Sequence, residues 1–216
     1  MGWGFKSVDE LFKPSSEHWV THDPESDAGF RPRKIEDDHA VAAQLGLGEH
    51  VSERIRDYFD AMRMLWVYGH LYYPFFSMAA VHAGLCMELA LKERLAAAGV
   101  QLPRKKQDLD GRLEYAVAVG WLAPSGFTAI RNRKANRDFF AEVTQNSGMP
   151  GEVSEIDDSP EGQRVALLEM LKGARLIRNE TAHPDFLTLM FPGMALGQLL
   201  FTRELIEQLF AQPNAQ

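Results

Sequence analysis

The chain has 216 residues, of which 45% are hydrophobic and 25% are charged, and its formal net charge is −7 at pH 7. This length predicts one large domain, or one domain with an extension, that can bury a core without disulfides or metals. The negative charge argues against a broad, non-specific grip on nucleic acid, which normally requires a basic surface. Any contact with RNA must therefore be local.

The single cysteine, Cys86, excludes an internal disulfide framework, and its apolar neighbours predict a small buried side chain rather than a nucleophile. The first residues lack the basic-then-apolar layout of a signal peptide. The longest stretch without a charged residue, 71–87, is interrupted by Pro74 and favours no membrane span. We therefore expect a soluble protein of a reducing cytoplasm that does not enter a membrane.

Residues 1–36 are rich in Pro, Ser, Asp and Gly and predict an irregular N-terminal arm, with a short helical possibility at 8–12. Helical patterns dominate residues 37–216, beginning with helices at about 38–45 and 49–70. Pro74 is expected to open a helix at about 74–98 that is apolar nearly all round and therefore central. This helix carries a stripe of small residues that permits close approach of a neighbouring helix: Ala79, Ala83, Cys86 and Ala90.

Further helices are expected at about 109–119 and 124–143. A polar and acidic stretch, about 144–163, indicates a long loop, and Ser159 and Pro160 are typical of the start of a helix that runs to about 183. A last helix is expected at about 191–211. Because no convincing alternating strand pattern or glycine-rich phosphate loop is present, the sequence predicts an all-α, antiparallel helical bundle.

A short motif near the end of the 160–183 helix carries the chemistry. Asn179 and His183 are four residues apart and so share one helix face, with Arg178 beside them and Arg175 one turn earlier. Pro184 disfavours helical geometry at His183, which places the imidazole at a helix C-terminus, where exposed carbonyls favour its protonated form. The alternative interpretation is that these residues form only a cap and a solvated ion pair.

The residue types of this motif suit phosphate-ester chemistry better than acyl transfer. A histidine can hold or deliver a proton near neutral pH, arginine offers a planar fork to phosphate, and asparagine both donates and accepts. No activated Ser or Cys accompanies them. We expect neither a metal nor a cofactor at this motif.

The run Leu176–Pro184 resembles the signature of the HEPN superfamily (higher eukaryotes and prokaryotes nucleotide-binding domain), in which Arg, usually followed by Asn, precedes His by four to six intervening residues. The run Ala83–Lys92 is similar to the family's earlier helix, where Glu and Lys are four residues apart; here these are Glu88 and Lys92. The resemblance covers roughly residues 50–212.

The resemblance implies a HEPN-like helical bundle that forms a homodimer in which two motifs face each other. Many members are metal-independent endoribonucleases, some from toxin–antitoxin or defence systems, and others are non-catalytic modules that bind nucleotides, RNA or protein. By the resemblance, His183 acts as general acid or base around the RNA 2′-hydroxyl and the leaving 5′-oxygen. Arg178 stabilises charge on the phosphate, and Asn179 orients groups. An antitoxin or regulatory protein is a possible further partner.

Glu88 is the first acidic residue after Asp60 in an otherwise apolar stretch, and a buried carboxylate needs a partner. One interpretation pairs it with Arg178, so that it supports the site together with Arg175 and Lys92. The alternative, weighed about evenly, is an ordinary surface pair between Glu88 and Lys92.

Two features depart from the family pattern. Some members carry a modifiable Tyr two residues after the His, but Asp185 occupies that position here. In addition, the run Ile130–Phe139 echoes the motif with Asn136 in place of the His. Because asparagine cannot transfer a proton, Arg131 and Asn132 are at most phosphate-binding residues, and chance similarity is the favoured account of the echo.

The sequence contains several weaker candidates for functional residues. The basic clusters at 104–106 and 131–137 suit local phosphate contact but are more often solvated faces. His18 and His22 have metal-ligand spacing without a third ligand, so no metal site is predicted. His70 and His82 are expected to be hydrogen-bonded core or interface residues. The aromatic residues at 72, 73, 75 and 76 could stack on bases, but core or dimer contact is favoured.

Overall fold

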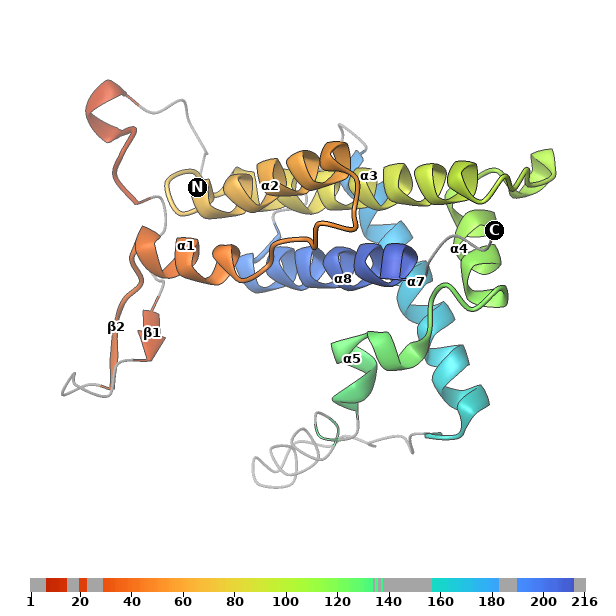
Figure 1. The fold of residues 1–216 in the computed structure, drawn as a ribbon. Helices are drawn as coiled ribbons and strands as arrows, with labels where there is room; N and C mark the ends of the chain where they lie inside the picture. Colours follow the sequence, from red (N-terminus) through yellow and green to blue (C-terminus); the bar gives the residue numbers. More distant parts are fainter. Residues whose placement is uncertain are drawn as a thin grey trace.

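The computed structural model describes residues 7–14, 20–22, 29–133, 135, 137, 157–182 and 190–211, without side chains for 20–22, 30 and 175–182. Its centre is three helices that run along one another: α2 (Glu53–Tyr68), α3 (Pro74–Ala97) and α8 (Pro192–Ala211). Helices α2 and α3 form an antiparallel hairpin, and α8 packs against both (Figure 1). The predicted all-α, antiparallel bundle is confirmed.

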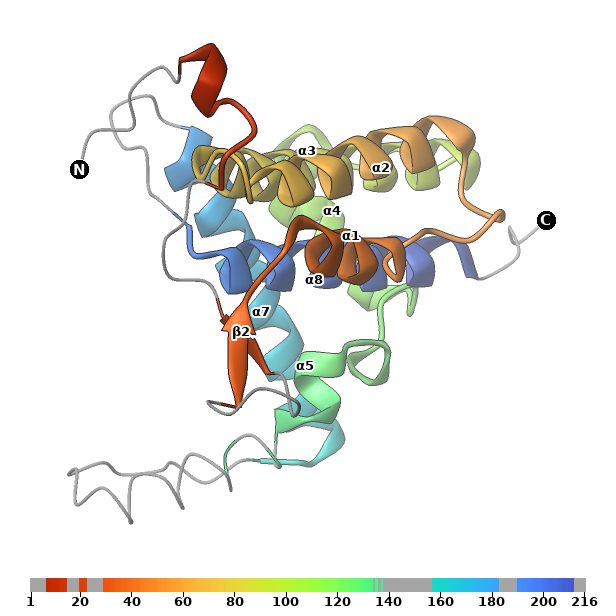
Figure 2. The ribbon, with the colours of Figure 1, turned by 90° about the vertical axis from the view of Figure 1, so that its left-hand side faces the viewer.

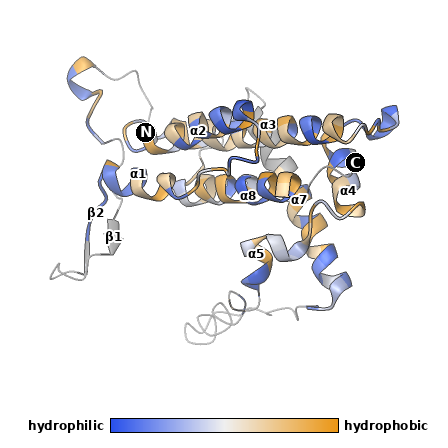
Figure 3. Ribbon diagram, in the orientation of Figure 1, coloured by the Kyte–Doolittle hydropathy of each residue, from blue (hydrophilic) through white to orange (hydrophobic). Residues whose placement is uncertain are grey.

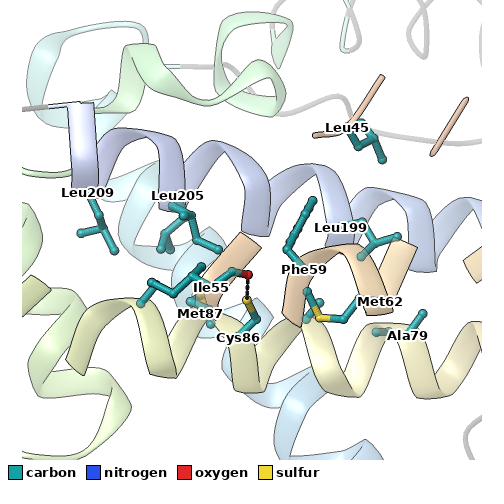
Figure 4. Close-up of a cluster of buried hydrophobic side chains, with 14 of the residues drawn as sticks. Leu45, Ile55, Phe59, Met62, Ala79, Cys86, Met87, Leu199, Leu205 and Leu209 are labelled. Atoms are coloured by element: carbon teal, nitrogen blue, oxygen red, sulfur yellow. Dashed lines mark hydrogen bonds between the residues drawn. The ribbon is translucent and has the colours of Figure 1, made fainter. Parts of the chain in front are cut away.

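Side-chain periodicity explains this packing. In α2 the fully buried residues Ile55, Phe59, Met62 and Trp66 recur at steps of three and four, which gives the helix one apolar face. In α3 the small-residue stripe is 0% exposed at all four of its positions, as predicted: Ala79, Ala83, Cys86 and Ala90. Figure 4 shows these layers meeting, with Phe59 and Met62 beside Leu199 and Ala79.

Pro74 is the first residue of α3, as predicted, and the uncharged stretch 71–87 is divided between a turn at 71–73 and this helix. By length and composition α3 is apolar enough to cross a membrane, and 61% of its most apolar window is buried inside the protein. The central helix of a folded core passes the same test. Cys86 is buried in this helix, and burial raises the pKa of its thiol to about 12, as befits an inert side chain.

The remaining helices pack around this centre. Helix α1 (Ile35–Ala43) lies on α2, and α4 (Leu109–Ala118) follows the end of α3. The long helix α7 (Pro160–Ala182) crosses α3 at a steep angle and also contacts α4 and α5 (Thr128–Arg131), as Figures 1 and 2 show. Three short 3-10 turns accompany them: η1 (Val8–Glu10), η2 (Arg104–Lys106) and η3 (Pro124–Gly126).

Side-chain hydrogen bonds cap the N-termini of two of these helices, α4 and α7. The Asp108 side chain accepts a hydrogen bond from the Gly111 backbone N–H at 2.9 Å, which caps α4. A Cβ at Gly111 would lie 2.5 Å from the Lys106 carbonyl oxygen, so glycine is what lets η2 approach α4. At α7, Ser159 Oγ accepts from the Gly162 N–H at 3.1 Å, as the Ser159–Pro160 pattern predicted.

The arm differs from the irregular segment predicted for 1–36. Strand β1 (Val20–His22) pairs antiparallel with β2 (Phe30–Pro32), and α1 begins at Ile35. Three-residue strands are too short to produce a detectable alternation. Of the expected 124–143 helix, α5 covers four residues and residues 133, 135 and 137 are helical. Most of the expected acidic loop, 144–156, lies outside the described residues.

Candidate functional site

The motif lies on the last turns of α7. The backbone is helical through Ala182, which places Arg175, Arg178 and Asn179 on this helix, as the sequence predicts. His183 lies outside the described residues, as do the side chains of the other three. The convergence of arginine, asparagine and imidazole on one face therefore stays a prediction.

The chain that leaves the motif returns to α3. The Met190 backbone N–H donates to Ser77 Oγ at 3.0 Å, and both residues are buried. Ser77 shares a face of α3 with Gly84 and Glu88, because their spacings of 7 and 4 bring them to similar angles around the helix. The motif segment thus leaves from a helix that packs on α3 and rejoins the fold on α3 itself.

Glu88 lies at the junction of α3 and α4, half-buried between two cations. Its Oε1 is 3.0 Å from Lys92 Nζ and 3.4 Å from Arg112 Nη1. The Arg112 side chain is only 15% exposed, so the carboxylate is the group that compensates a largely buried guanidinium. The Glu88–Lys92 contact of the predicted alternative is present, but Glu88 is half-buried rather than on the surface; a contact with Arg178 is not tested, because that side chain lies outside the described residues.

Arg112 was missed by the sequence analysis. It reaches Glu88 from another helix, 24 positions away, and no local spacing announces such a contact. Lys92 and Arg112 also line a hollow of about 460 Å³ at the end of α3, with Gln101 and Gln107 on its wall. The rest of its wall is apolar and includes Leu95, Val100 and Leu102.

Arg131, proposed as a phosphate-binding residue, is engaged within the fold. Its guanidinium donates to the Ser125 carbonyl at 2.7 Å and to Thr128 Oγ1 at 2.6 Å, and it lies 3.8 Å from the Glu204 carboxylate. Asn132 ends α5 through its backbone. These contacts tie α5 to α8, and a phosphate would compete with three partners for the same guanidinium. Asn136 lies outside the described residues.

The predicted roles of two histidines are confirmed. His82 Nδ1 shares a hydrogen bond of 2.8 Å with the Tyr58 hydroxyl, between α3 and α2, and burial raises the pKa of that tyrosine. His70 Nδ1 lies 3.0 Å from Asp38 Oδ2, and both side chains are buried. Both histidines therefore hold helices together.

The aromatic run at 72–76 is structural. Phe76 is 2% exposed and packs edge-to-face with Trp66, and Tyr72 and Tyr73 pack in the same way on Phe75 and Phe76. Phe76 and Tyr73 contribute to the core, as favoured from the sequence, while Tyr72 and Phe75 are partly exposed and pack on each other.

A charged cluster that the sequence analysis did not find joins the arm to the bundle. Asp38, 3% exposed, bonds His70 and lies 2.5 Å from Arg33 Nε, and the Arg33 guanidinium rests over the Trp66 ring. Burial raises the pKa of Asp38, while Arg33 and His70 act against that shift. The residues of this cluster come from three segments of the chain. In the sequence, the only indication of the cluster was the apolar surroundings of His70, which predicted that this histidine has a hydrogen-bond partner.

A metal centre has no support within the described residues, which contain no group of three or more His, Cys, Asp or Glu side chains. His18 and the side chain of His22 lie outside them, so their spacing stays untested. No family model, curated protein or solved structure matches the chain. The resemblance of the motif therefore rests on its own residues and on the helices that carry them.

Proposed function

We propose that this protein is a metal-independent endoribonuclease of HEPN type, with Arg178, Asn179 and His183 as its site. The observation that carries the proposal is the Arg-Asn-x3-His motif, whose Arg178 and Asn179 lie on the last turns of α7, a long helix that crosses the Glu88-bearing helix α3 in an all-α fold. The order of these elements, with Glu88 and Lys92 upstream and α8 downstream, matches the order that the resemblance implies.

The proposed reaction is an internal transesterification. The RNA 2′-oxygen attacks the adjacent phosphorus and the bond from phosphorus to the 5′-oxygen breaks, which leaves a 2′,3′-cyclic phosphate and a 5′-hydroxyl. His183 takes the proton from the 2′-hydroxyl or supplies one to the leaving oxygen, and the motif of a second copy contributes the complementary group. Arg178 offsets the charge that develops on the phosphate oxygens, and Asn179 holds the reacting groups in place.

Glu88 takes a supporting role in this proposal. With Lys92 and Arg112 as neighbours, its carboxylate is held at the junction of α3 and α4, on the face of α3 that also carries Ser77. A carboxylate fixed there keeps the adjoining cations in defined positions. Arg175, one turn before the motif, adds positive charge on the same helix.

A second function is favoured by a different observation: a non-catalytic HEPN-like module that binds a nucleotide, RNA or a protein. The chain carries a net charge of −7, and the described arginines 63, 112 and 131 each lie within 4 Å of a carboxylate. A chain of this net negative charge is less suited to holding a long RNA strand, which favours a binding or regulatory role.

The deciding experiment incubates the purified full-length protein with labelled RNA in excess chelator. His183→Ala and Arg178→Ala are each expected to lower the cleavage rate by about 10²-fold or more, because each removes a group that acts in the transition state. His39→Ala is the matched control, since His39 is exposed on α1 and should leave the rate unchanged. Mass spectrometry of the fragments should find cyclic phosphate and 5′-hydroxyl ends.

Equal cleavage by wild type and both motif variants would assign the activity to a contaminant and remove the proposal. RNA binding that survives without cleavage, and that Arg178→Ala weakens, would establish the non-catalytic alternative.

A further inference from the structure

The η1 turn exposes three large apolar side chains that nothing covers in the described part of the chain. Val8 is 80% exposed and Phe12 is 84% exposed, with Leu11 at 44% between them. Their spacing of three and four places them on one side of a helical turn, and the acidic residues Asp9 and Glu10 lie between them. A cluster of this kind on a terminal arm indicates a segment that docks into a complementary surface.

A groove between α4 and α7 offers such a surface. It encloses about 540 Å³, and its apolar wall includes Leu113, Val117, Leu168 and Leu171. Three cations line it as well: Lys106, Arg164 and Lys172. Figure 3 shows the apolar stretches of α4 and α7 next to each other, and those of η1 at the far side of the molecule.

The charges of the groove and of the segment are opposite. Asp110 and Glu114 also line the groove, so its titratable side chains sum to a small positive charge in a chain of net charge −7. Arg164 makes no hydrogen bond or ion pair with any described residue, and it is an exposed residue of the groove lining, available to the acidic pair of η1.

We infer that η1 of one copy occupies the α4–α7 groove of a second copy. Val8, Leu11 and Phe12 pack on the apolar wall, and Asp9 and Glu10 face Arg164 and its neighbouring cations. This is the recognition of a short amphipathic helix by a groove, in which apolar residues at steps of three and four supply the contact area. The inference does not depend on the ribonuclease proposal.

The fold places the root of the arm far from its own groove. Arg33, just after β2, lies over Trp66, whose indole N–H donates to the Pro192 carbonyl at the start of α8. The chain beyond α4 is tied to the other end of α8, where the Ala123 N–H donates to Gln208. At a rise of 1.5 Å per residue, these two points of α8 are roughly 24 Å apart.

The arm spans this distance only when it is almost fully extended. Val20 is held beside Pro32 by the β1–β2 pairing, and the eight residues from Val20 back to Phe12 reach at most about 28 Å when fully extended. Docking within one chain would require that stretched form. The groove of a second copy can bind η1 without extension of the arm.

Cross-linking of two single variants tests the exchange directly. Ser7→Cys places a thiol beside η1 without removing an apolar anchor, and Ala118→Cys places one in the groove. Mixed in equal amounts and treated with a short bismaleimide, the two variants should give a covalent dimer. Cys86 does not compete, because it is buried and burial raises the pKa of its thiol to about 12. The matched control mixes Ser7→Cys with Ala61→Cys, which is exposed on α2.

Reversing the charges of the groove and of η1 distinguishes specific docking from a change in the structure of either variant. Arg164→Glu in the Ala118→Cys chain should lower the dimer yield about two- to fivefold, as expected for an exposed ion pair. Asp9→Lys with Glu10→Lys in the Ser7→Cys chain should restore it. No cross-link in the first mixture, a yield no greater than the Ala61→Cys control, or a cross-linked monomer from a chain with both cysteines would overturn the inference.

Discussion

Asp38 shows how a charged side chain is tolerated inside this fold. Burial makes its ionised form costly, which is why its pKa is raised, while Arg33 and His70 compensate part of that cost. Asp37, the preceding residue, has the opposite shift. Two hydrogen bonds of 2.7 Å from Arg31 and one from the Lys34 N–H lower the pKa of its half-exposed carboxyl.

A pH series checks the raised pKa of Asp38. A raised folded-state pKa means that Asp38 contributes most to stability below its unfolded value of 3.8 and contributes less as the pH rises through the folded value. The difference in unfolding free energy between wild type and Asp38→Asn should therefore become less favourable to wild type from pH 3.5 to pH 7. Urea unfolding at each pH measures it. A difference that grows with pH would contradict the assignment.

Sequence could predict only those contacts that helical spacing encodes. The Glu88–Lys92 pair was such a contact, and so was the Ser159 cap, because both lie within one turn of a helix. Arg112 and Arg33 reach their carboxylates from other segments. Their positions depend on how elements pack, which a single sequence leaves open.

At the scale of elements, α3 depends on small side chains. Ala83 and Ala90 are 0% exposed on α3, which packs on α2, α7 and α8, and their small side chains permit a close approach of neighbouring helices. The periodicity of the sequence identified this helix and its stripe. It could not identify β1 and β2, whose three-residue strands leave no period to detect.

Overpacking of α3 tests the close approach. Ala83→Leu is expected to lower the free energy of unfolding by about 1–3 kcal/mol, because the added carbons have no space to enter. Ala97→Leu, at an exposed position of the same helix, should change it by about 0.5 kcal/mol or less. Chemical denaturation of both variants measures the difference. Equal stabilities would show that the stripe leaves unfilled space.

At the scale of the whole molecule, the proposed activity belongs to two chains. The resemblance implies a composite site, and the arm exchange supplies a separate reason for chains to associate. The sequence predicted the all-α class because every long periodic segment had the helical period. It could not place the arm or the α4–α7 groove, since these depend on which helices become neighbours.

Cleavage should consequently depend on protein concentration. The rate per chain is expected to rise with concentration and then level off, in step with the fraction of dimer, because a site built from two motifs is absent in the monomer. Parallel measurements of mass by light scattering and of RNA cleavage check this. A constant rate per chain across the range in which the mass doubles would contradict a composite site.

The pairing of α3 with α8 also bears on how the protein is made. About 95 positions separate the end of α3 from the start of α8, and α8 supplies much of the surface that buries α3. At translation rates of about 5–20 residues per second, the most apolar helix waits at least several seconds for its partner. A nascent chain that has emerged only as far as α4 should therefore engage chaperones that bind exposed apolar segments.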